Sequence, residues 1–260
     1  MLSFHKPKNP ILSKYVEGYY FVKSAEADFS LSYYTFPNNF QIVTCALESE
    51  IVIEKDRLVS GHDKNAPFLS TLTYNYSKPI KIEYHGKVNE LTIYFKPLGL
   101  RHFAGNISEF YTNQHFIPFL PFEDFKHDMT AVLCKSTIEE AIESLENYWI
   151  SHLSGSNLEK IEQIIDLLDV VNVQQAAEKL QISRQYLHKV FKSYLGKSPI
   201  EYRRIQRFRN AIDFPDASPD ENLFYDQSHF IRETLKFTDN SPKKLLEKIE
   251  YRTANPWLLL

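Results

Sequence analysis

Residues 172–211 read NVQQAAEKLQISRQYLHKVFKSYLGKSPIEYRRIQRFRNA and predict two short helices joined by a tight turn, followed by a third, longer helix. Asn172 and Ser183 are suited to cap the first two helices, because each precedes apolar residues at helical spacing. Gly196 tolerates the positive φ with which helices often end, and Pro199 suits the first turn of the next helix. Two short helices so closely joined must cross steeply, so the stretch predicts a helix-turn-helix. The second helix is expected to present one apolar face, made of Tyr186, Leu187, Val190, Phe191 and Tyr194.

Basic side chains dominate part of this stretch. Eight lysines and arginines and one acid, Glu201, lie between Arg184 and Arg209, which leaves a local charge of +7, whereas the whole chain carries −3. Such a local excess is typical of a surface that meets phosphates. The alternative is a solvated basic face with no partner; the overlap with the helix-turn-helix pattern favours the first interpretation.

The composition indicates a folded, two-domain protein. The chain has 260 residues, 43% of them hydrophobic, which suffices for two cores. Cys45 and Cys134 stand far apart in unlike contexts, which favours reduced thiols over a disulfide. No apolar run reaches the length of a membrane-spanning helix, and the N-terminus lacks the apolar segment of a signal peptide, so we expect a cytoplasmic protein without membrane contact.

Residues 15–95 follow a period of two, which is typical of strands with one face in a core and one in water. Short strands that follow one another without helices predict an antiparallel sandwich or barrel. The polar stretch 60–64 (SGHDK) is expected to be a turn between strands rather than a catalytic site. The candidate strands are 15–22, 31–36, 40–47, 51–54, 68–74, 80–85 and 91–95.

Many of the expected inward residues of this domain are aromatic. An aromatic interior can hold a small-molecule effector, although an aromatic stripe is more often plain core. The candidate pocket residues are Tyr19, Phe21, Tyr33, Phe36, Tyr84 and Tyr94.

Catalytic and metal-binding patterns find no support in the sequence. The nine histidines are scattered, and no two have a ligand-like spacing with a carboxylate or cysteine between them. There is no Gly-rich phosphate loop and no nucleophile elbow. We therefore expect no enzyme, no catalytic residues, no metal and no cofactor. An enzyme or sugar-binding barrel with a helical targeting domain is a remaining alternative, which would need convergent His, Asp or Glu side chains.

A helical pattern begins after the last strand. Ser136 and Glu139 form a predicted capping box for one of the helices. The apolar stripe of that helix must be buried, either on its own sheet or against a second chain, and we favour a homodimer interface. Residues 154–156 (SGS) form a flexible linker between a β-rich regulatory domain, 1–153, and a helical domain, 157–260. The candidate helices outside the opening stretch are 98–103, 124–133, 136–153 and 158–171.

About the last hundred residues resemble the AraC/XylS family of transcriptional regulators. The resemblance lies in ISRQYLHKVFKSYLGKSPIEY (182–202), Arg207 with Ala211, and FYDQSHFIRETLKFTDNSP (224–242), of which the last run is the most distinctive. It implies a seven-helix DNA-binding domain with two helix-turn-helix units joined by a long helix, here 199–214. Double-stranded DNA and RNA polymerase are the partners it implies.

The resemblance also assigns contacts residue by residue. Base-contacting positions in the first unit match Gln185, His188 and Lys189, of which Gln suits adenine and Lys suits guanine. Phosphate contacts are expected from Ser183, Arg184 and Lys192. In the second unit, Gln227 and Ser228 are candidate base contacts, and Arg232 is a candidate phosphate contact.

The second unit departs from the family pattern. Residues 218–223 leave less than two turns for a positioning helix, Thr234 replaces a core aromatic, and Asp239 stands where glycine is favoured. We therefore predict a shortened second unit that contributes weakly to base reading. An alternative is a protein-interaction module with only residual DNA binding.

These observations predict an α+β two-domain protein: an N-terminal antiparallel sandwich or barrel with appended helices, and a C-terminal all-α domain. The expected function is sequence-specific DNA binding in transcription regulation, with a small molecule in the β domain as the candidate effector. The coupling is expected to pass through helix 136–153 and the linker.

Overall fold

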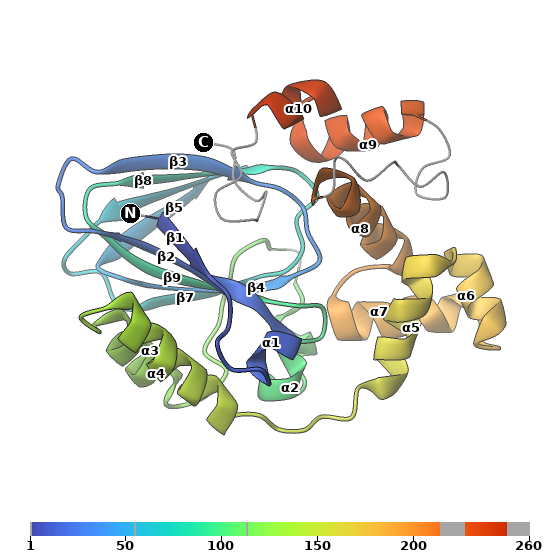
Figure 1. Ribbon diagram of the computed structural model, residues 1–260, viewed down its shortest axis with the longest axis horizontal. Helices are drawn as coiled ribbons and strands as arrows, with labels where there is room; N and C mark the ends of the chain where they lie inside the picture. The colour runs from blue at the N-terminus through green and yellow to red at the C-terminus, as the bar shows by residue number, and fades with distance from the viewer. Residues whose placement is uncertain (1, 55, 113, 214–226, 249–260) are drawn as a thin grey trace.

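The computed structural model describes residues 2–54, 56–112, 114–213 and 227–248, without the side chains of 211–213, 227–230 and 246–248. A β-rich half, which carries the N-terminus, lies beside a half made of helices α5 to α10 (Figure 1).

Two sheets form the β-rich half. The larger has the order β1-β2-β9-β4-β7-β10 and the smaller β3-β8-β6-β5. The sheets form an open sandwich rather than a closed barrel, and every described strand pair is antiparallel except β6 with β8. The strands are β1 (Leu2–His5), β2 (Val16–Ser24), β3 (Ser30–Thr35), β4 (Gln41–Leu47), β5 (Ser49–Glu54), β6 (Arg57–His62), β7 (Leu69–Thr73), β8 (Ile80–His85), β9 (Val88–Phe95) and β10 (Ile117–Pro118).

The sequence pattern finds the central strands and misses three others. Strand β8 has the predicted bounds, whereas β1, β6 and β10 were not expected. The predicted turn at 60–64 is wrong in its first part, because β6 continues through His62 and the turn follows from Asp63.

The helices complete both halves. Within the described residues they are α1 (Leu12–Tyr15), α2 (Arg101–Ala104), α3 (Phe125–Leu133), α4 (Ile138–Ser151), α5 (Glu159–Val170), α6 (Val173–Lys179), α7 (Arg184–Leu195), α8 (Pro199–Asp213), α9 (Gln227–Thr238) and α10 (Pro242–Lys248), with a 3-10 turn at η1 (Ser108–Phe110).

Helix α4 packs with α3 on one face of the larger sheet (Figure 1). Ala141, Leu145 and Trp149 of its apolar stripe are fully buried within the chain. The interpretation of this stripe as a dimer interface is therefore wrong, because its own domain already covers it. The predicted cap is also displaced by one residue: Thr137 caps the helix, in a capping box with Glu140.

Strand β9 shows how the larger sheet serves two cores. Leu91 and Ile93 point to the helix-covered face, while Glu90, Thr92 and Tyr94 line the space between the two sheets. This alternation follows from the two-residue period of a strand. The space between the sheets is therefore lined by different residues from the core under α3 and α4.

The opening stretch folds as the sequence predicts. The Asn172 side chain accepts a hydrogen bond from the Gln175 amide at 2.9 Å, and the Asn172 amide donates one to Oε1 of Gln175 at 3.1 Å. Ser183 caps α7 by accepting from the Tyr186 amide at 3.1 Å. Gly196 ends that helix with φ +70°, in the left-handed conformation that glycine adopts at little cost.

The two halves share apolar contacts. Phe36, at the end of β3, packs in a cluster with Ile205 and Phe208 of α8 and with Phe237 of α9. Leu98 packs in the core of α5 to α8. Segments from the β-rich half thus complete two of the helical cores.

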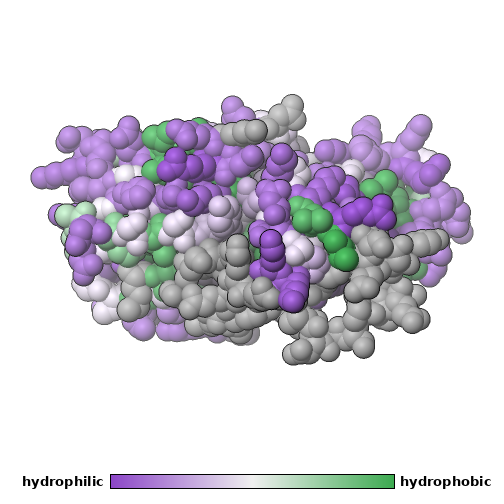
Figure 2. All heavy atoms as spheres, turned by 90° about the horizontal axis from the view of Figure 1, so that it is seen from above, coloured by the Kyte–Doolittle hydropathy of each residue, from purple (hydrophilic) through white to green (hydrophobic). Residues whose placement is uncertain are grey.

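Hydrophilic residues cover most of the coloured surface in Figure 2, and the hydrophobic residues there form only small patches. Among the described residues, no helix is both long and apolar enough to span a membrane.

Candidate functional site

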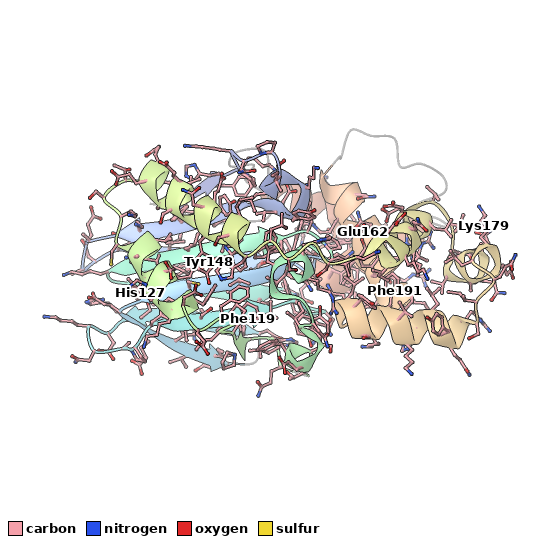
Figure 3. The ribbon with its side chains drawn as sticks, turned by 90° about the horizontal axis from the view of Figure 1, so that it is seen from below. Phe119, His127, Tyr148, Glu162, Lys179 and Phe191 are labelled. Atoms are coloured by element: carbon pink, nitrogen blue, oxygen red, sulfur yellow. The ribbon has the colours of Figure 1, made fainter. Side chains whose placement is uncertain are left out.

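Helix α7 divides into a buried face and an exposed face. Leu187 and Phe191 are fully buried, and Figure 3 shows Phe191 turned into the helical core. On the exposed side lie Gln185, His188 and Lys189, the three residues expected to read bases. The predicted phosphate contacts Ser183, Arg184 and Lys192 are exposed as well.

One residue of this surface is not indicated by the sequence pattern. The helical spacing places Tyr186 on the apolar face of α7, yet 56% of it is exposed. It lies one turn before Lys189 and Val190, so it borders the basic exposed face of α7. Its ring and hydroxyl can contact a base or a sugar there.

Most of the basic residues that follow α7 face the protein. Lys197 and Arg209 are buried. Arg203 donates to the Leu168 carbonyl at 2.7 Å, and Arg204 forms a bidentate pair with Glu233 of α9 at 2.6 and 2.8 Å. The exposed cations of this run are therefore those of α7.

The second unit is described only in part. Its expected short positioning helix, 218–223, lies outside the described residues, as do the side chains of Gln227 and Ser228 at the start of α9. Arg232 is exposed. Thr234 is completely buried.

Asp239 ends α9 in the left-handed conformation, at the position where the resemblance led us to expect glycine. Its φ is +55°, and its amide donates to the Leu235 carbonyl at 2.9 Å. The left-handed conformation that ends the helix is therefore kept, although an aspartate adopts it at a higher energetic cost than a glycine.

The β-rich half holds the C-terminal end of α7. Tyr111 donates a hydrogen bond to the Tyr194 carbonyl at 2.8 Å. The Arg101 guanidinium donates to the Ser193 carbonyl at 3.4 Å and lies 4.6 Å from the Tyr194 ring centre. A cation and a hydroxyl thus satisfy carbonyls that the helix itself leaves unpaired.

A second contact joins the halves at the turn between α7 and α8. The Lys197 ammonium donates to the Asn38 carbonyl and, at 3.4 Å, to Oδ1 of Asn39. Asn39 in turn donates to the Tyr202 carbonyl at 3.0 Å. Burial lowers the pKa of Lys197 from 10.5 to about 7.

A cavity of about 220 Å³ lies between the two sheets. Tyr33, Tyr84 and Tyr94 of the predicted pocket line it. Tyr19 and Phe21 do not, because they point to the face under α3 and α4. Phe36 also lies elsewhere, in the cluster with α8 and α9.

Glu90 is a cavity residue that the sequence pattern does not indicate. It is 4% exposed, and its Oε1 accepts hydrogen bonds from Tyr84 at 2.5 Å and from Thr92 at 3.4 Å. Burial raises the pKa of Glu90 to about 7. An acid at an inward position of the alternating strand β9 is the signal that could have identified it.

Metal ligands do not gather anywhere in the described part of the chain: no group of three His, Cys, Asp or Glu side chains there could hold an ion.

Comparison with known proteins finds a family model that matches part of the helical region. Residues 169–204 match the model of the bacterial regulatory helix-turn-helix proteins, AraC family. No curated protein matches the chain. Among solved structures, the crystal structure of ToxT from Vibrio cholerae O395 is similar, with 13% sequence identity and a TM-score of 0.40 over 88% of this chain and 92% of that one.

Proposed function

We propose that this chain, a DNA-binding transcriptional regulator that carries the AraC-family helix-turn-helix in residues 169–204, recognises its operator mainly through α7. The observation that carries the proposal is the capped helix α7, whose exposed face combines Gln185, His188 and Lys189. Amide, imidazole and ammonium groups on one helix face can reach base edges in the major groove. Ser183, Arg184 and Lys192 contact the flanking phosphates in this arrangement.

The second unit makes a smaller contribution in this proposal. Arg232 provides a phosphate contact, while Arg204 and Glu233 serve to fix α9 against α8. Gln227 and Ser228 are the proposed minor base contacts.

Selection of bound fragments from random DNA, followed by titration of affinity against salt, tests the proposal. We expect a recovered sequence motif and a linear fall of log affinity with log salt. Lys189→Ala should relax the base preference within the motif, whereas Arg232→Ala should lower the affinity for all DNA sequences alike.

Lys126→Ala is the matched control, because Lys126 is an exposed lysine on α3 of the β-rich half. It should leave affinity and salt dependence unchanged. A flat salt response without preference between selected and random duplexes contradicts the proposal and favours a protein-interaction module.

We further propose that a small molecule in the cavity between the sheets controls DNA binding. A chain of hydrogen bonds supports this control: Tyr76 lines the cavity, Asn38 donates to its hydroxyl at 2.8 Å, and Lys197 donates to the Asn38 carbonyl. Movement of Tyr76 would therefore reach the turn at which α7 meets α8. We propose this route in place of one through α4 and residues 154–156.

Replacement of Tyr76 tests the route. Tyr76→Phe keeps the ring and removes the hydroxyl, so we expect a severalfold change in operator affinity. Tyr34→Phe is the control, because Tyr34 is an exposed tyrosine of β3. Equal affinities for the two variants would contradict the route.

A further inference from the structure

The cavity between the sheets has two unlike walls. The larger sheet contributes polar side chains, among them Thr44, Thr92 and Glu90, and the hydroxyls of Thr44 and Thr92 are 3.2 Å apart. The smaller sheet contributes mainly apolar ones, such as Ile51 and Ile82. A ligand that fits both walls has an apolar body and a polar group on one side.

One charge decides which polar group fits. Of the cavity-lining residues in the described chain, Glu90 is the only carboxylic acid, and none is lysine, arginine or histidine. Both hydrogen bonds that Glu90 accepts end on Oε1. Neither of these two bonds uses Oε2, and the residue as a whole is 4% exposed.

A buried carboxylate without a cation is unfavourable, and burial accordingly holds the pKa of Glu90 near 7. A ligand that brings a positive charge removes this cost, because it supplies the missing partner and a donor for Oε2. The rings of Tyr33, Tyr84 and Tyr94 line the same cavity and favour a cation through their faces. A ligand carboxylate would instead face Glu90 without any basic side chain to neutralise it.

We propose that the cavity binds a small amine, with the ammonium group on Glu90 and an apolar body against the smaller sheet. A cavity of 150 Å³ holds benzene, so about 220 Å³ accommodates an amine of about eight to ten heavy atoms. This inference rests on the proposed ligand-responsive function and names the chemical class of its effector.

Three probes of similar size and different charge test the proposal by isothermal titration calorimetry on the full chain: 2-phenylethylamine, 2-phenylethanol and phenylacetate. We expect the amine to bind about tenfold or more tightly than the alcohol, and phenylacetate not to bind. Equal affinities for amine and alcohol, tighter binding of phenylacetate, or no binding of any probe would overturn the proposal.

Proton release gives a second readout that needs no variant. An ammonium next to Glu90 drives its carboxyl to ionise, so amine binding should release close to one proton at pH 6 and almost none at pH 8, as measured in buffers of different ionisation enthalpy. Release that does not depend on pH would contradict the role of Glu90.

Glu90→Gln should abolish the preference for amine over alcohol, whereas Glu50→Gln, at an exposed glutamate of β5, should keep it. If Glu90→Gln does not fold, the probe series and the proton release of the unaltered protein still test whether Glu90 binds an amine.

Measurement of operator affinity in the presence of the probes separates this proposal from the proposed ligand control of DNA binding. Selective amine binding without a change in DNA affinity refutes ligand control alone, while DNA affinity that responds equally to all three probes refutes amine selectivity alone.

Discussion

Replacement of Lys197 by methionine should flatten the alkaline pH dependence of stability. Lys197 is 2% exposed, and its ammonium bridges the two halves through the Asn38 carbonyl. Burial lowers its pKa from 10.5 to about 7, while the nearby Glu201 opposes the shift. Between these two pKa values the unfolded chain binds a proton that the folded chain has released.

The free energy of unfolding contributed by this group therefore rises with pH between about 7 and 10.5. The limiting slope is about 1.4 kcal/mol per pH unit, and the whole window amounts to about 5 kcal/mol. Below pH 7 the amine is protonated in both states and the full cost of burying the charge applies. Above pH 10.5 it is neutral in both states and the cost is gone.

Urea unfolding followed by helical circular dichroism at pH 8 and pH 9 measures the effect. We expect the rise in stability between these pH values to be about 1 kcal/mol larger in the unaltered protein than in Lys197→Met. The difference between the two proteins cancels the tyrosines and thiols that titrate in the same range. Lys179→Met, at an exposed lysine that Figure 3 shows at the outer end of the helical half, should keep the full slope. An equal rise in Lys197→Met and the unaltered protein would refute the reasoning.

Three further substitutions test local geometry through the free energy of unfolding. Asp239→Gly should stabilise the chain by about 0.5–1 kcal/mol, because glycine adopts φ +55° without strain; a loss of stability would contradict this. Thr234→Val should stabilise by about 1 kcal/mol, because the fully buried hydroxyl has no partner among the described residues, and an unchanged midpoint would show that it has one. Gly196→Ala should destabilise by about 2 kcal/mol or more, since its φ is +70° and a Cβ would lie 2.3 Å from the Tyr74 ring; a loss below about 0.5 kcal/mol would mean that the ring moves aside freely.

Local signals in the sequence predict the helix-turn-helix well. The caps at Asn172 and Ser183 and the left-handed Gly196 are set by residues within one turn of them, so composition and spacing suffice. The same holds for strand β8, whose alternation is regular. At the start of α4, serine and threonine are adjacent, and only the observed geometry distinguishes Thr137 as the cap.

Long-range contacts account for what the sequence does not predict. The burial of Lys197 depends on Asn38, 159 positions earlier, and no local pattern separates this lysine from the exposed ones on α7. The exclusion of Tyr19 from the cavity depends on which face of the larger sheet the helices cover. Glu90 becomes a candidate ligand anchor only when the second sheet closes over it.

The contacts at the end of α7 limit how freely the two halves can be exchanged in engineered chimaeras. A helical half joined to an unrelated sensor would lack Arg101 and Tyr111, so the carbonyls of Ser193 and Tyr194 would lose their donors. Lys197 would lose its carbonyl partner at the same junction. A chimaera that keeps DNA binding intact must therefore include these donors and the segment around Asn38. The boundary between the two parts then follows the contact surface of the two halves and cannot be a single cut between consecutive residues.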